Sequence, residues 1–319
     1  LVLAENVTRL WRRLVEAGDA GRAERFAERL RLLAASGVAV AAAVSEPGPQ
    51  DLTRPSTTAT RVADGWRVDG VKAFCTMSPV ADLLNVAVSY TDGAGRERYG
   101  FALVPTAADG VTVHDDWDAL GMRGSGSGRV TLSGVLLGLD EISDSNPAGQ
   151  PSAALMDRYL TSGLFHAAAT LGVAETAHAH VVCTTQERRD RLAAGGRSRQ
   201  LVAANAVDLA AMRATIARAA HTAQEHLAAD TPADEDAALV RSAAAFAAAQ
   251  AAKALIDRCG VQVVDRALEL SGGAGYLSGN PLSRAYRDVR AGAFMHPLGG
   301  NRAHDFVGAV ELGVTPDLR

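Results

Sequence analysis

Cysteine is scarce in this chain. The three cysteines, Cys75, Cys183 and Cys259, lie far apart among 319 residues and are odd in number. This spacing excludes a disulfide framework and a Cys-x-x-Cys metal site, so we expect a reducing, cytoplasmic setting.

The chain also lacks a block of basic residues and a long uninterrupted apolar run. Its 32 basic and 36 acidic residues give a net charge of −4 and an isoelectric point near 6.1. We therefore expect no nucleic-acid partner and no membrane association. No signal peptide is evident. The chain opens at Leu1 without a methionine, which leaves the native N-terminus open.

Metal and simple nucleophile chemistry have no support in the sequence. His178 and His180 are two residues apart on an expected helix, so their side chains point to different faces. No Gly-x-Ser-x-Gly motif is present for a serine nucleophile. We predict no metal site.

Three compositional regions follow one another. Residues 1–37 carry apolar residues at helical spacing and predict two helices, the second from about 20 to 34. Residues 38–142 alternate as strands do and predict an antiparallel β-domain. Residues 143–319 begin with an expected loop (143–152), rich in Ser, Asn, Pro and Gly. They continue as alanine-rich helices that predict a bundle.

Glycines mark expected breaks between elements. Asp64-Gly65 predicts a hairpin turn, and Gly70 predicts a break that separates two strands. The segment TDGAGRER (91–98) lies between two alternating runs and predicts a hairpin loop. Gly260 is expected to cap the C-terminal end of a long helix.

The stretch ALGMRGSGSGRV (119–130) concentrates glycine and serine. A dinucleotide-binding glycine loop opens a helix, but this run leads into a strand-like VTLS segment, so a Rossmann loop is not expected. A plain linker is also disfavoured, because Leu120, Met122 and Arg123 lead directly into the run. A tight connection beside a ligand and an ordinary glycine-rich turn both stay open.

Four segments in order resemble the acyl-CoA dehydrogenase superfamily. LGMRGSGSG (120–128) is similar to the L-G-x-R-(A/G)-S/T-x-S motif, and AAVSEPG (42–48) to V-T-E-P-G. VDGVKAFCTMS (68–78) is similar to N-G-x-K-x-W-I-T-N. ELSGGAGYLSGNPLSRAYRDVR (269–290) is similar to Q-x-x-G-G-x-G-Y with the following P-x-x-R-x-x-R-D-x-R.

The resemblance implies an α+β fold. It comprises an N-terminal helical domain, incomplete here, an antiparallel β-domain and a C-terminal four-helix bundle. It also implies a flavin between the β-domain and the bundle, and a homodimer or homotetramer in which the cofactor bridges subunits.

The same resemblance implies the flavin-binding residues of the β-domain. Ser45 corresponds to a hydroxyl beside the flavin ring, Phe74 replaces the usual tryptophan, and Thr76 corresponds to a donor near the reactive ring nitrogen. The phosphate-approaching loop comprises Arg123 to Ser127, with Ser125 and Ser127 as its hydroxyl groups. The alternative for each is an ordinary turn, core or strand residue.

In the helical region, Gly272 and Gly273 correspond to a turn that approaches a neighbour's dinucleotide, where glycine lets the backbone come close. Glu269 stands where the family has glutamine, and a carboxylate near a pyrophosphate needs compensation. The family's R-x-Q-F segment is missing; Arg188 and Arg189 are possible substitutes or a solvated patch. FAD is the first expectation and FMN the alternative.

The catalytic base separates two enzyme hypotheses. His296 occupies the position of the family's usual glutamate, and Asp157, directly before an arginine, is the other candidate base. In two-component flavin monooxygenases of the superfamily, a histidine at this place is thought to support a flavin hydroperoxide. The alternatives are a structural role for Asp157 and an interface role for His296.

The first expectation for function is α,β-dehydrogenation of an acyl thioester or related small molecule. A reduced-flavin-dependent monooxygenase is the second, and a non-catalytic ligand-binding relative the third. The segment Gly48-Pro49-Gln50-Asp51 departs from the family's G-A-G-S-D loop, so CoA, a carrier-protein thioester and a free substrate all stay open. An electron-transfer or flavin-reductase partner is also expected.

Overall fold

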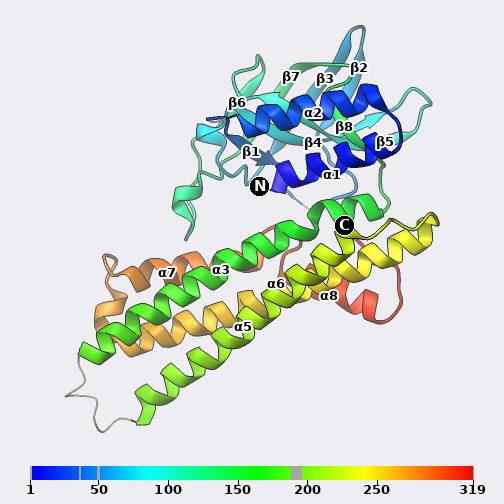
Figure 1. Cartoon of the computed structure of the whole chain (residues 1–319). Coiled ribbons are helices and arrows are strands. Elements are labelled where there is room, and N and C mark those ends of the chain that lie inside the picture. Colours follow the sequence, from blue (N-terminus) through cyan, green and yellow to red (C-terminus); the bar gives the residue numbers. More distant parts are fainter. Residues whose placement is uncertain (1, 36, 49–50, 188–195, 319) are drawn as a thin grey trace. The chain divides into compact units, whose positions relative to one another are not determined.

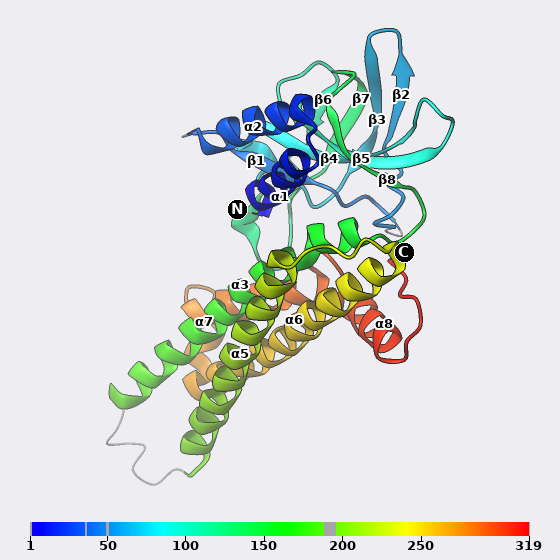
Figure 2. The same ribbon diagram turned by 45° about the vertical axis from the view of Figure 1, so that its right-hand side comes forward.

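The computed structural model describes residues 2–35, 37–48, 51–187 and 196–318. The chain divides into two compact units, whose architecture Figures 1 and 2 show. A β-unit comprises residues up to Asp118, Arg123–Ser152 and the C-terminal end. A helical unit comprises Ala153–Asp317 together with the short segment Ala119–Met122.

The β-unit opens with a helical hairpin of α1 (Val2–Glu16) and α2 (Ala20–Ala34), as predicted. Asp19 caps α2 by accepting a hydrogen bond from the backbone N–H of Arg22. The two helices share a small core of their own, formed by Val7, Leu14, Ala23 and Phe26.

One mixed sheet follows, in the order β6-β7-β3-β2-β4-β5-β8, with β1 paired to β4. Its strands are β1 (Val40–Ala43), β2 (Thr58–Val62), β3 (Gly65–Lys72), β4 (Leu83–Thr91), β5 (Glu97–Pro105), β6 (Val111–Val113), β7 (Val130–Gly138) and β8 (Ile142–Pro147). The expected antiparallel pairing holds for most neighbours, but β1 and β2 both run parallel to β4. Alternate side chains of these strands form the core of the unit.

Two local predictions in the β-unit were wrong. Gly70 does not end a strand, because β3 continues through it with a register shift against β7. A Cβ at this position would collide with the side chain of Thr57, which explains the glycine. Residues 143–147 are not a loop, because their backbone pairs with β5 as part of β8. The sheet therefore continues past the predicted boundary at residue 142.

The helical unit is organised around one central helix. Its elements are α3 (Ala153–Glu187), α5 (Gly196–Ala228), α6 (Glu235–Ser271), α7 (Pro281–Val289) and α8 (Gly300–Glu311). α6 packs against each of the other four, and α3 and α5 also pack against each other. Alanine and valine side chains fill these contacts, so the long helices approach closely.

Gly260 does not cap a helix, because α6 continues for a further three turns. A Cβ on Gly260 would lie 2.6 Å from Cγ2 of Thr170 on α3, so the glycine permits close helix packing. The cap is Gly272 instead, whose positive φ of 63°, with ψ of −154°, is a backbone conformation that glycine adopts more readily than other residues.

Among the described helices, the one that begins at Glu235 is long and apolar enough to span a membrane by length and composition. More than half of its apolar window is buried within the structure, as in the core helix of a bundle. This is weak evidence for a membrane span.

Candidate functional site

In the β-unit, the turn that follows β3 is held by backbone hydrogen bonds to two other segments. The N–H of Ala73 donates to the carbonyl of Ser45 (2.9 Å). The N–H of Cys75 donates to the carbonyl of Gly128 (3.0 Å), and that of Met77 to Ser125 (2.9 Å). The structure thus brings together three segments that the family motifs contain.

Three hydroxyl groups meet at this turn. The Ser127 hydroxyl lies 3.0 Å from that of Thr76 and 2.7 Å from that of Ser125. Phe74 has a positive φ of 53° and its side chain is 65 % exposed, although the residue is large and apolar. Strained backbone of this kind persists where the surroundings require it, often at binding sites.

The β-unit therefore offers an aromatic face next to a row of hydroxyl groups. A flat ring with polar edges matches the hydroxyl groups of Thr76, Ser125 and Ser127 beside Phe74, whereas Ser45 joins the turn through its backbone carbonyl. The guanidinium of Arg123 lies 3.1 Å from the carboxylate of Asp118 at an exposed position.

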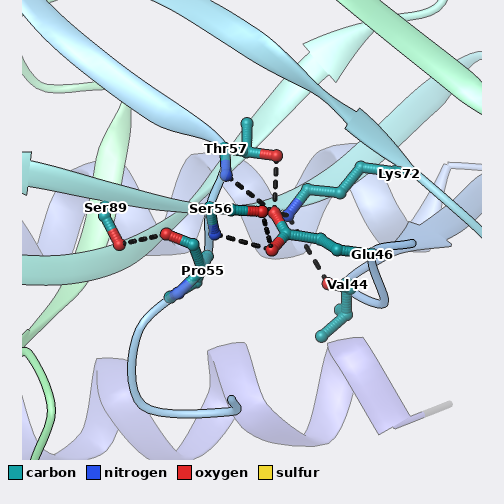
Figure 3. Close-up of polar contacts among 7 residues, drawn as sticks. All are labelled: Val44, Glu46, Pro55, Ser56, Thr57, Lys72 and Ser89. Carbon is teal, nitrogen blue, oxygen red and sulfur yellow. Dashed lines mark hydrogen bonds and ion pairs between the residues drawn. The ribbon is translucent and has the colours of Figure 1, made fainter. Parts of the chain in front are cut away.

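The structure adds two residues that the sequence interpretation did not select, Glu46 and Lys72. The Lys72 ammonium lies 2.7 Å from the Glu46 carboxylate, which also accepts hydrogen bonds from Ser56 and Thr57. Figure 3 shows these contacts. Burial acts to raise the pKa of Glu46, but the Lys72 charge and these hydrogen bonds lower it to about 2. Both residues lie within the quoted motifs, directly beside Ser45 and the 73–77 turn.

In the helical unit, Glu269 forms a forked ion pair with Arg197. Nη2 of the arginine lies 2.9 and 3.2 Å from the two carboxylate oxygens. The carboxylate that replaces the family's glutamine is thus compensated by a cation on α5. A Cβ on Gly272 or on Gly273 would meet no atom within 4 Å. The structure does not describe four residues named in the sequence analysis: Pro49, Gln50, Arg188 and Arg189.

His296 lies in an enclosed part of the helical unit. Its ring packs edge-on against Tyr159 with centroids 4.5 Å apart. Within the part of the chain that the structure describes, neither ring nitrogen has a hydrogen-bond partner. Burial and then the charges of His166, Lys253, Arg302 and Arg158 lower the pKa of His296 to about 3. The imidazole is therefore neutral at neutral pH.

A buried polar cluster holds the segment that leads to His296. Lys253 donates to the carbonyl of Gly292 (2.7 Å) and pairs with Asp257 (2.9 Å). Gly292 approaches Asp257 so closely that a Cβ would collide with the carboxylate. Nδ1 of His166 lies 2.6 Å from the carbonyl oxygen of His296. The backbone is therefore held at Gly292 and at His296 itself.

The other candidate base, Asp157, is held by a histidine. Oδ1 of Asp157 on α3 lies 2.7 Å from Nε2 of His226 on α5, and the side chains are 10 % and 6 % exposed. The carboxylate thus has a partner inside the helical unit.

A half-open groove of about 610 Å³ lies between α3 and α7. Small residues of α3 border it, including Ala169, Gly172 and Ala177. His180, Arg284 and Asp288 are its polar residues. None of the residues predicted from the sequence lines this groove. Its volume is typical of small-molecule sites, roughly 300–1,000 Å³.

A mixed sheet followed by a helical bundle is the architecture that the resemblance to the acyl-CoA dehydrogenase superfamily predicted. Residues 41–135 match the model of the acyl-CoA dehydrogenase middle domain, and residues 155–301 match that of the C-terminal domain. The chain belongs to the acyl-CoA dehydrogenase superfamily.

Two relatives are about one third identical to this chain over the aligned residues. The L-evernosamine nitrososynthase of Micromonospora sp. is 33% identical over 292 residues, which are 92% of this chain and 67% of the relative. The amino sugar nitrososynthase DnmZ of Streptomyces peucetius is 34% identical over 261 residues, or 82% of this chain. The matched part covers 63% of DnmZ, so the chain spans less than two thirds of that relative.

The structure is also similar to that of KijD3 in complex with FMN and dTDP-3-amino-2,3,6-trideoxy-4-keto-3-methyl-D-glucose. The TM-score is 0.84 at 29% identity, and the match covers 98% of this chain and 73% of KijD3. The predicted superfamily and α+β architecture are thus confirmed.

Proposed function

We propose that this protein oxidises the amino group of a nucleotide-linked amino sugar, with dioxygen and a reduced flavin as co-substrates. In the first oxidation, one oxygen atom is transferred to nitrogen to give a hydroxylamine. The other leaves as water, and the reduced flavin supplies two electrons and two protons. A second equivalent of dioxygen and reduced flavin then oxidises the hydroxylamine to a nitroso sugar, with the release of two molecules of water.

The observation that carries this proposal is the neutral, enclosed His296 at the position of the dehydrogenases' glutamate. An imidazole with a pKa of about 3 is uncharged at neutral pH, so it can donate or accept a hydrogen bond without adding charge. Relatives named as amino sugar nitrososynthases support the same conclusion.

The flavin would be held by the hydroxyl groups of Thr76, Ser125 and Ser127, with Phe74 against the ring. When bound, the flavin supplies the two-electron chemistry that side chains lack. We favour FMN over FAD, because the adenosine-binding R-x-Q-F segment is missing and KijD3 was solved with FMN.

The groove between α3 and α7 is the proposed site of the nucleotidyl part of the substrate. Its volume suits a sugar nucleotide, and Arg284 offers a guanidinium to the diphosphate. Asp288 also lines the groove, but its carboxylate accepts a hydrogen bond from the N–H of Met122 (2.7 Å). This hydrogen bond partly offsets the negative charge of the Asp288 carboxylate.

Dehydrogenation of an acyl thioester is the second candidate, supported by the two dehydrogenase family models. It needs a carboxylate that removes an α-proton. Asp157 is the carboxylate predicted for that role, yet His226 engages it at 2.7 Å. An acyl thioester that bleaches the bound flavin without oxygen would favour this candidate.

We propose a cytoplasmic homodimer or homotetramer that receives reduced flavin from a separate reductase. The test combines purified protein, FMN, a flavin reductase and dTDP-linked amino sugars. Mass spectrometry with isotope-labelled dioxygen should show one labelled oxygen on the sugar nitrogen. Unlabelled product, or no product with any amino sugar, would contradict the proposal.

His296→Ala should keep FMN binding but release hydrogen peroxide in place of oxidised sugar. The expected loss of product formation is roughly 10²- to 10⁴-fold, the typical contribution of a residue that handles protons. Asp157→Asn is the matched variant and should cost less. If Asp157→Asn were the more damaging of the two, the dehydrogenase candidate would gain.

A further inference from the structure

The chain uses lysine at two positions, although it has 32 basic residues. Both lysines, Lys72 and Lys253, are buried and each pairs with a carboxylate. Lysine presents a compact point charge, whereas arginine presents a planar fork. Lys72 is the one of the two that lies beside the proposed flavin face.

The Glu46 carboxylate is the centre of a dense set of hydrogen bonds. Ser56 donates to Oε2 through both its N–H and its hydroxyl (2.6 Å each). Thr57 donates to Oε1 in the same two ways, at 2.8 and 2.6 Å, and Lys72 donates at 2.7 Å. Figure 3 shows the five bonds converging on one side chain.

This cluster lies between the two segments that contribute to the proposed flavin site, residues 44–46 and the 73–77 turn. Glu46 directly follows Ser45, and Lys72 is the last residue of β3, directly before the 73–77 turn. Lys72 also lies 3.5 Å from the carbonyl of Val44. The backbone hydrogen bond from Ala73 to Ser45 also links the 44–46 segment to the 73–77 turn.

Burial of the Glu46–Lys72 pair carries a desolvation cost that offsets much of the attraction between the two charges. Burial lowers the pKa of Lys72, so the protein disfavours the charge that Glu46 attracts. Buried ion pairs can often be replaced by apolar residues without loss of stability, whereas removal of one partner is strongly destabilising. What an apolar pair cannot supply is directional hydrogen bonding at fixed distances.

We propose that Glu46 and Lys72 are positioning residues that hold Ser45 and the 73–77 turn in the geometry that binds flavin. Gly70 belongs to the same cluster, because its lack of a Cβ leaves room for the side chain of Thr57. The proposal rests on the flavin site of the proposed function.

The test uses Lys72→Met, Glu46→Gln and the double variant, with Lys72→Arg as the conservative replacement. Hydrogen exchange measured by mass spectrometry should show faster exchange in residues 44–46 and 73–77 of each single variant. The FMN dissociation constant should rise, and the double-mutant cycle should show roughly tenfold coupling, within the range for residues in contact. Lys72→Arg should not restore affinity.

Leu84→Ala is the matched control, because Leu84 is fully buried in the sheet core and lies outside this cluster. It should lower the free energy of unfolding without changing FMN affinity or exchange of the turn. The neutral double variant keeps the test valid if a single variant does not fold.

Two results would overturn the positioning role. One is unchanged exchange at 44–46 and 73–77 in every variant; the other is a loss of affinity no greater than in Leu84→Ala at equal stability. A wild-type protein that binds no flavin would contradict the proposed function instead, while the exchange measurement would still decide whether the pair fixes the turn.

Discussion

Burial keeps the His296 imidazole neutral at pH values well below 6.5, the ordinary pKa of histidine. The unfolded chain binds a proton at this residue more readily than the folded protein does. The contribution of His296 to stability is therefore complete above pH 6.5 and is lost as the pH falls toward 3.

We predict that His296→Gln flattens the acid dependence of stability. Between pH 6 and pH 4 the wild-type protein should lose up to about 1.4 kcal/mol more per pH unit than the variant, the limit for one proton. Urea unfolding of both proteins across this range measures the difference. Parallel curves would contradict the enclosed, neutral histidine.

At the groove, we predict that Arg284→Gln raises the KM for a dTDP-linked amino sugar and leaves the FMN dissociation constant unchanged. A charged hydrogen bond contributes roughly 1.5–3 kcal/mol, so the KM should rise about tenfold or more. Arg266→Gln is a control outside the groove, at the ion pair with Asp208. An unchanged KM in Arg284→Gln would remove the groove from the substrate site.

At the scale of elements, two glycines in the long helices differ in the space available to an added methyl group. Gly260 on α6 faces Thr170 across a helix contact, whereas Gly172 on α3 has no atom within 4 Å of a Cβ position. Helix propensity favours alanine at both positions by about 1 kcal/mol. Only the tertiary contact distinguishes them.

Gly260→Ala should therefore destabilise the helical unit by roughly 1–3 kcal/mol, because the added methyl group overpacks the α3–α6 contact. Gly172→Ala should stabilise it by about 0.5–1 kcal/mol. Urea unfolding followed by circular dichroism compares the two. Equal effects would show that close packing at Gly260 is not limiting.

At the scale of the whole molecule, exposed apolar side chains bear on assembly. Tyr276 and Phe294 in the helical unit are each more than four-fifths exposed. Large exposed apolar groups often mark protein interfaces. Tyr276 follows the paired glycines that, by resemblance, approach a neighbour's cofactor.

We predict that the wild-type protein is a dimer or tetramer in multi-angle light scattering. Tyr276→Asp combined with Phe294→Asp should shift it toward a smaller species and weaken flavin binding, because a closed two-fold interface repeats every substitution. Leu136→Asp, an exposed apolar position in β7, is the control. A wild-type monomer with full flavin occupancy would exclude a bridging cofactor.

The sequence by itself determined what depends on short-range pattern. The helix–sheet–helix order and the hairpin at 91–98 follow from periodicity and turn residues, whereas the grouping of Phe74 and Thr76 was implied by the resemblance to the family motifs. Such signals suffice because side-chain alternation and turn residues are local properties of the chain.

Tertiary structure decided what depends on partners distant in the chain. Residues 143–147 become a strand because β5 offers backbone groups to pair with, and Gly260 stays helical because α3 packs against it. Glu46 and Lys72 are separated by 26 positions, so the burial of their charges is settled only when the sheet forms. The rarity of lysine was a signal in the sequence, but its meaning came from that burial.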